Sequence, residues 1–265
     1  MQKSIFSLGL LVWAKRLLAA LLLAGQVFVH VLGGRIDRRN TLEQMASVGP
    51  QSLIITSVTA FFVGAVFTIQ VAREFLNFGA GGVVGGVLAL ALLRELAPAL
   101  TAVLLAGRVG SAFAAEIGTM RVTEQIDALH MLHTDPVDYL VTPRVLACCL
   151  MTPILTLLFA LIGTLGGLLV ASNLYAIEPS IFLESVQNFL GAWDICAASI
   201  KALVFGALVA VIGSSWGLTT SGGAKGVGTS TTAAVVTALL SIFICNFFMS
   251  SLMFRGVGQA LQQSL

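Results

Sequence analysis

The chain has 265 residues, of which 57% are hydrophobic and only 10% are charged, with a mean hydropathy of +0.98. This composition excludes a soluble globular domain and predicts an all-α polytopic membrane protein. The formal net charge is only +2 and no basic run is present, which argues against nucleic acid as a partner.

Residues 1–50 are expected to form an N-terminal region with a helix at the membrane surface. The stretch 17–34 is uncharged, but basic residues flank it on both sides, namely Lys3, Lys15, Arg16, Arg35, Arg38 and Arg39. A crossing would place one of these clusters outside, against the positive-inside tendency. We therefore predict an interfacial or re-entrant helix, while a sixth span is left open.

Residues 51–265 are expected to form a transmembrane domain with five membrane-spanning helices. The first begins after Gly49-Pro50, because proline suits the first turn of a helix. The predicted spans are residues 52–71, 79–107, 145–175, 198–218 and 227–254. With the amino end inside, ten of the fourteen basic residues fall on the cytoplasmic side, whereas Arg73, Lys201 and Arg255 fall outside.

Two glycine groups predict close contacts between helices. Gly81, Gly82, Gly85 and Gly86 give overlapping small-xxx-small spacing at the start of the second span, and Gly163-xxx-Gly167 does so in the third. Glu178-Pro179 begins a segment with one apolar and one polar side, for which we predict an interfacial helix on the outer side.

The second span carries Arg94 and Glu95 near its middle, followed by Pro98. A charge at the bilayer centre costs about 2.5–3.5 kcal/mol on insertion scales, so such residues indicate a cavity or a partner. Pro98 cannot donate to the carbonyl of Arg94, which frees a polar backbone group beside the charges. The two charges are about 100° apart around the helix, so each needs its own partner. A purely structural role, with Arg94 snorkelling and Glu95 as a cross-link, is the alternative.

The largest polar segment, residues 108–144, is expected to be cytoplasmic. Apolar residues at three- and four-residue spacing predict a short amphipathic helix within Glu116–Leu132. Asp135-Pro136 and Thr142-Pro143 each resemble an N-cap followed by proline, so a helix is expected to begin at both.

Three further patterns are weak signals for chemistry. The loop TTSGGAKGVGTS after the fourth span fails the phosphate-loop spacing, because Gly226 follows Lys225, and a flexible cytoplasmic turn is expected. His130 and His133 lack a third metal ligand, so a surface pair is the better interpretation. The four cysteines show neither metal nor disulfide spacing, and no cofactor is expected.

The run LLRELAPALTAVLLAGRVGSAFAAEIGTMRVTEQIDAL, followed by HTDPVDYLVTPR, resembles the signature of MlaE-type permeases. These are lipid-transporting ABC permeases that include those of the chloroplast inner envelope. The resemblance is strongest from Leu90 to Arg144. It implies a homodimer that binds two cytoplasmic ATPases and a ring of lipid-binding MCE proteins, and that moves phospholipid between membranes.

The resemblance also assigns roles to residues of this chain. It implies a substrate pocket at Arg94, Glu95 and Pro98, and a cytoplasmic coupling helix that docks on the ATPase. The coupling residues are Glu116, Met120, Arg121, Glu124, Gln125 and Asp127. The location implied is the bacterial cytoplasmic (inner) membrane or the plastid inner envelope.

Two other function classes were weighed. A secondary transporter or channel would use the midplane charges for ion or proton coupling, but internal inverted repeats are not apparent. An intramembrane lipid-modifying enzyme would need a cluster of polar catalytic residues near one interface, and the sequence has no such cluster.

Overall fold

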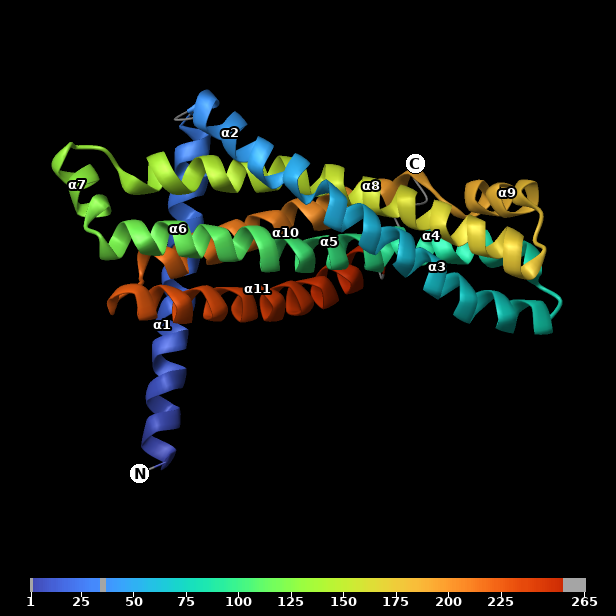
Figure 1. The fold of residues 1–265 in the computed structure, drawn as a ribbon, viewed down its shortest axis with the longest axis horizontal. Coiled ribbons are helices and arrows are strands. Elements are labelled where there is room, and N and C mark those ends of the chain that lie inside the picture. Colours follow the sequence, from blue (N-terminus) through green and yellow to red (C-terminus); the bar gives the residue numbers. More distant parts are fainter. Residues whose placement is uncertain (1, 34–36, 255–265) are drawn as a thin grey trace. The chain divides into compact units, whose positions relative to one another are not determined.

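The computed structural model describes residues 2–33 and 37–254, which form helices joined by short turns, without a strand among them (Figure 1). Among the residues used above, Arg35 and Arg255 lie outside the described residues, as does the end of the domain expected over 51–265. The expectation of an all-α protein is confirmed.

The chain forms two compact units, each assembled from three separate segments. Unit 1 comprises residues 1–48, 105–150 and 206–241, and unit 2 comprises residues 49–104, 151–205 and 242–265. The division expected at residue 50 stays a prediction.

Six helical segments of the described chain are long and apolar enough to cross a membrane. They are Trp13–Leu32, Arg38–Asn77, Gly81–Val122, Val137–Tyr175, Ala192–Leu218 and Gly223–Phe254. The first is part of α1 (Gln2–Leu32), the helix expected at the membrane surface. In Figure 1, α1 runs across the part of α11 (Gly223–Phe254) that belongs to unit 1, rather than along it. Its interfacial placement stays a prediction.

Small residues bring the helices of unit 2 into close contact. A Cβ at Gly64 of α3 (Leu53–Asn77) would overlap the backbone of Gly163 in α8 (Thr142–Tyr175). The backbone N–H of Gly86 in α4 (Val84–Ala91) donates to Ser185 Oγ of α9 (Pro179–Phe189) at 3.0 Å. Gly85 similarly lies against Phe182. The predictions that the glycines of the second and third spans mark packing faces are thus confirmed at these positions.

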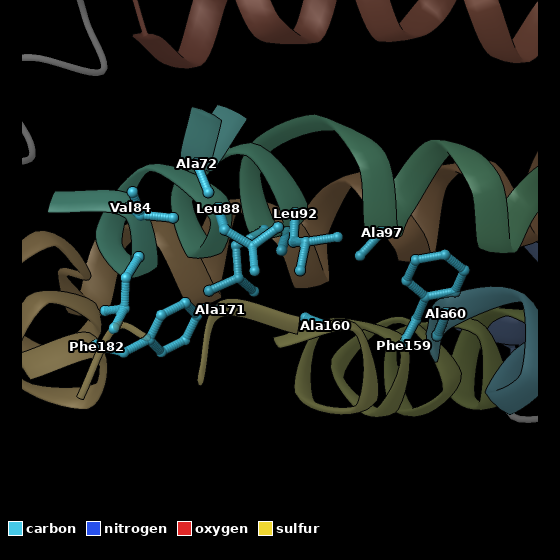
Figure 2. Close-up of a cluster of buried hydrophobic side chains, with 13 residues drawn as sticks. Ala60, Ala72, Val84, Leu88, Leu92, Ala97, Phe159, Ala160, Ala171 and Phe182 are labelled. Carbon is cyan, nitrogen blue, oxygen red and sulfur yellow. The ribbon is translucent and has the colours of Figure 1, made fainter. Parts of the chain in front are cut away.

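The core of unit 2 packs around α4 and the turn that follows it. Figure 2 shows Leu88 and Leu92 with Phe159 of α8 and Phe182 of α9, and all four side chains are buried. This packing fixes Leu88 of α4 and Leu92 of the following turn, and with them the direction of the charged residues that come next.

The helix of the second span does not end at Gly107 as predicted, whereas the end of the span in the membrane stays a prediction. The chain stays helical from Gly81 to Val122, through α4, α5 (Ala97–Leu105) and α6 (Ser111–Val122), with two π-helical turns in between. At about 1.5 Å per residue, these 42 residues are roughly twice as long as the ~30 Å hydrocarbon core. Arg108 does not end the helix, because its guanidinium donates to the carbonyl of Ser47 at 3.2 Å.

Of three other helix boundaries, two differ from the predictions and one agrees. Arg73 lies within α3 rather than in a turn, which begins only after Asn77. Asp135 caps as expected, since its Oδ1 accepts from the N–H of Val137 at 2.9 Å. Thr142 does not cap a helix, because the π-helical turn Val137–Val141 continues directly into α8. The hydroxyl of Thr142 instead donates to the carbonyl of Val137.

The loop after the fourth span is also shorter than expected. The helix α10 (Ala192–Leu218) ends close to α11, and only Thr219–Gly222 connects them. Gly222 and Gly223 have φ values of 89° and 65°, which glycine adopts without strain, so the chain reverses within these few residues. Lys225 therefore lies in the first turn of α11 and not in a flexible loop.

Candidate functional site

The centre of the site is a π-helical turn, Leu92–Leu96, between α4 and α5 of unit 2. It contains Arg94 and Glu95, and Pro98 follows in the first turn of α5. Single π turns inside α-helices occur often at functional sites, because they change the direction of the side chains.

A buried lysine side chain donates a hydrogen bond to a backbone carbonyl of this turn. Lys201 of α10 donates from Nζ to the carbonyl oxygen of Arg94 at 2.6 Å, and its side chain is fully buried. Pro98 leaves this carbonyl without its usual helical donor, so the prediction of a freed polar backbone group is confirmed. Lys201 lies inside α10, which begins at Ala192. The outer location expected for it stays a prediction.

The carboxylate of Glu95 accepts three hydrogen bonds. Its Oε1 accepts from Lys201 Nζ at 3.0 Å and from Ser250 Oγ at 2.6 Å. Its Oε2 accepts from Asn246 Nδ2 at 2.8 Å. Asn246 and Ser250 are four residues apart and therefore share one face of α11. The carboxylate is held in a fixed orientation by charge-assisted bonds from two different helices.

Arg94 has its own acidic partner. Its Nε donates to Asp194 Oδ1 at 2.7 Å, and Asp194, which is 1% exposed, also accepts from the N–H of Gly191 at 2.9 Å. The guanidinium carbon lies 4.7 Å from the ring centre of Phe254. Its terminal nitrogens have no hydrogen-bond partner among the described residues, so this side chain keeps donors for a further group.

The prediction that Arg94 and Glu95 need separate partners is confirmed. Two ion pairs, Arg94–Asp194 and Glu95–Lys201, bring two positive and two negative groups together in unit 2. Pairing with additional hydrogen bonds offsets the cost of holding charges in a low-dielectric environment.

The charged turn forms one wall of a cavity of about 470 Å³ in unit 2. The cavity is lined by Leu90, Ala91, Arg94, Glu95, Phe247, Ser250, Ser251 and Phe254. Pro98 is buried and does not line it, so its part in the expected pocket is indirect, through the carbonyl of Arg94. The cavity combines apolar and aromatic walls with a few oriented polar groups, as small-molecule sites commonly do.

In unit 1, the expected coupling helix is two helices rather than one. The first is the end of α6 and the second is α7 (Gln125–Met131), with a break at Thr123 and Glu124. Glu124 has a φ of 62°, a left-handed conformation that costs a non-glycine residue about 1–2 kcal/mol. The coupling helix that the resemblance implies over Glu116–Leu132 is therefore not continuous, but α7 is a short helix within the segment where the apolar spacing predicts one.

The coupling residues fall into two groups. Glu116 Oε2 accepts from Arg144 Nη2 at 2.9 Å, and Asp127 Oδ1 accepts from Arg121 Nη1 at 2.7 Å, so these charges already have partners. The side chains of Glu124 and Gln125 are exposed beside the break, and Met120 is half-buried. His130 and His133 are exposed, and no group of three side chains suited to hold a metal occurs in residues 2–33 and 37–254.

Comparisons with known proteins match almost the whole chain. The family described as Permease MlaE matches residues 41–252. The chain belongs to the MlaE permease family. A probable ABC transporter permease of Synechocystis is 68% identical over 94% of this chain and 95% of its own length. The chloroplast protein TRIGALACTOSYLDIACYLGLYCEROL 1 of Arabidopsis thaliana is 51% identical over 91% of this chain and 69% of its own length. A probable permease of Rickettsia prowazekii is 42% identical over 81% of this chain and 83% of its own length.

As a member of the MlaE family, the protein is a multi-pass membrane permease of an ABC transporter. Permeases of this kind are the membrane-spanning subunits and are not themselves enzymes, and membership implies an ATPase partner.

Sequence reasoning about this MlaE permease missed four residues of the charged network, which are Asp194, Lys201, Asn246 and Ser250. A signal for them was present. Asp194 and Lys201 are seven residues apart, so they lie on one face of a helix, two turns from each other. Asn246 and Ser250 are four residues apart, so they also share a face, one turn from each other. Polar residues with helical spacing inside apolar segments indicate partners for an intramembrane charge.

Proposed function

We propose that this MlaE permease moves a phospholipid or a related lipid between membranes, powered by a separate cytoplasmic ATPase. The observation that carries the proposal is the cavity at the π-helical turn, with charged groups on one wall and aromatic and aliphatic side chains on the others. A lipid offers the matching chemistry, since its headgroup is polar and its chains are apolar.

In this proposal Arg94 attracts a phosphate or another polar headgroup. Its terminal N–H groups suit phosphate oxygens, while its Nε is held by Asp194. Glu95 contacts the headgroup or holds α11 through its bonds to Asn246 and Ser250. Phe247 and Phe254 provide the apolar wall for an acyl chain. One relative bears the name of a galactolipid, trigalactosyldiacylglycerol, which supports a lipid as the substrate class.

The assembly proposed is a homodimer with an ATPase on the cytoplasmic side and an MCE-domain lipid-binding protein on the other. Two copies of the charged turn would then face a shared central cavity. Relatives occur in a cyanobacterium, in red algae and in a chloroplast, so we propose the bacterial cytoplasmic membrane or the plastid inner envelope.

The proposed coupling surface is the break between α6 and α7, where Glu124 and Gln125 are exposed. Charge reversal by Glu124→Lys is expected to release the ATPase while the permease still folds, since the side chain makes no ion pair with the described residues of unit 1. The matched control is Glu43→Lys, another exposed glutamate of unit 1, which should leave ATPase binding unchanged. If the ATPase stays bound after reversals along the whole segment, the docking site lies elsewhere.

A transport assay tests the lipid cavity. The complete complex is reconstituted in vesicles with fluorescent phospholipid, and ATP-dependent transfer is measured for Ser251→Trp, which fills the cavity, and for Ile200→Trp on the exposed face of α10. The first variant should lose transfer and the second should keep it, with both complexes intact. Normal transfer by Ser251→Trp would rule the cavity out, and transfer by the pure chain without ATPase would favour a secondary transporter.

A further inference from the structure

The C-terminal end of α1 lies against two carboxylates in unit 1. His30 is in the last turn of α1, with its Nε2 atom 3.8 Å from Asp135 Oδ2 and its Nδ1 atom 3.6 Å from Asp138 Oδ1. Asp135 and Asp138 belong to the turn that begins the long helix leading into α8. The three side chains join segments more than 100 residues apart in the sequence.

This geometry suits a histidine that carries both ring protons. The side chain of His30 is 15% exposed, and its Nδ1 atom and Asp138 Oδ1 are buried without a hydrogen-bond partner among the described residues. A neutral imidazole has one N–H, so its other nitrogen would turn a lone pair toward a carboxylate. The imidazolium has an N–H for each carboxylate and adds a positive charge between them. The α1 helix also favours a cation in its last turn.

His30 is the group that pairs with Asp135 and Asp138, as the contacts of the surrounding polar side chains indicate. Asp135 Oδ1 is occupied by the N–H of Val137, so Oδ2 is the atom that faces the ring. Asp37, His133 and Tyr139 line the neighbouring cavity of about 390 Å³ together with the two aspartates. The carboxylate of Asp37 accepts from backbone N–H groups of α2 (Arg38–Val48). Within the described ranges, His30 alone forms an ion pair with either aspartate.

We propose that His30, Asp135 and Asp138 form a proton-operated latch between α1 and the start of the α8 helix. Protonation of His30 closes the latch, because the imidazolium attracts both carboxylates. Loss of the proton as the pH rises opens it, because one carboxylate then faces a lone pair. The latch itself needs no assumption about transport.

One consequence rests on the proposed function. The coupling segment Glu116–Leu132 ends three residues before Asp135, so the latch sets how firmly its C-terminal end is held. A closed latch ties the segment to α1, and an open latch releases it. Coupling to the ATPase would then respond to cytoplasmic pH.

Hydrogen exchange of the full chain in lipid nanodiscs tests the latch directly. Exchange is followed at the amides of Val137 and Tyr139, which donate to Oδ1 and to the carbonyl of Asp135 respectively. Labelling at about pH 5.5 and about pH 8 lies on either side of the ordinary histidine titration, with times scaled for intrinsic exchange. The wild type should exchange about threefold to tenfold more slowly at the lower pH, as expected for two partly exposed charge pairs.

Variants separate the latch from other effects of pH. His30→Gln should remove the difference between the two pH values, and His30→Lys should keep the slow exchange at both. His130→Gln, which changes an exposed histidine of α7, is the matched control and should behave as the wild type. If His30→Gln folds poorly, Asp138→Asn should reduce the difference in the same way.

The latch is overturned if His30→Gln or Asp138→Asn keeps the full difference, or if His130→Gln removes it. A pH-dependent latch without any change in ATPase coupling would overturn only the consequence for transport. The failure of the proposed function, seen as absent lipid transfer, leaves the exchange result untouched.

Discussion

Replacing Lys201 with Met is the most informative single perturbation of the charged turn. Lys201 is fully buried and donates to the carbonyl of Arg94, to Glu95 and to Ser250. Breaking a buried pair by removing one partner costs about 3–5 kcal/mol. Glu95 is 43% exposed and keeps two other donors, so solvent screening places the expected loss near ~3 kcal/mol.

Part of that loss belongs to the backbone rather than to the ion pair. Without Lys201 the carbonyl of Arg94 loses its donor, and an unsatisfied buried acceptor costs about 1–3 kcal/mol. Pro98→Ala restores an N–H that can donate to this carbonyl in a helix. We therefore expect Pro98→Ala to recover about 1 kcal/mol in the Lys201→Met background, and to gain nothing from this bond in the wild type.

The free energy of unfolding of the four chains of this double-mutant cycle is measured by SDS titration in mixed micelles. Glu95→Gln in the Lys201→Met background provides the control for charge, because it removes the unpaired carboxylate and leaves the carbonyl as it is. Equal effects of Pro98→Ala in both backgrounds would refute the argument that Lys201 replaces the donor that proline lacks.

Three further predictions concern other parts of the chain. Gly64→Ala should lower the free energy of unfolding by about 1–3 kcal/mol, because its Cβ overlaps the backbone of Gly163. Gly228→Ala meets open space and should raise the free energy of unfolding by about 0.5–1 kcal/mol. Equal effects of the two substitutions would contradict the packing. Glu124→Asn should raise thermal stability slightly, because asparagine tolerates the left-handed conformation, yet weaken ATPase binding in a pull-down; unchanged binding would remove Glu124 from the docking surface. Asp194→Asn should cost about 2 kcal/mol in the same SDS titration, because Arg94 loses its charged partner, and a neutral result would show that the pair is dispensable.

Much of the fold could be predicted from the sequence because apolar runs and glycine spacing are local signals. The membrane class, the packing face at Gly163 and the start of α9 at Pro179 follow from such patterns. Helix ends were predicted less well. Polar residues were taken as the ends of spans, but the helix continues from α5 through Arg108 into α6, and the Arg108 side chain finds a carbonyl partner.

The site shows the same division between local and distant information. Arg94, Glu95 and the carbonyl freed by Pro98 could be derived from one stretch of sequence. Their partners, Asp194 and Lys201, come from a helix 100 residues further on, and only the packing of α10 in unit 2 identifies them. The conformation of Glu124 was not predictable either, since nothing in its residue type favours a positive φ.

The central claim is that a lipid occupies the cavity beside Arg94 and Glu95. It is tested most directly by photo-crosslinking in the complete complex, with benzoylphenylalanine in place of Phe247 in the cavity or of Phe62, an exposed phenylalanine of α3 that does not line it. We predict phospholipid adducts at position 247 that change when ATP turnover is trapped, and adducts at position 62 that do not. Adducts that are the same at both positions, and indifferent to ATP, would contradict the claim.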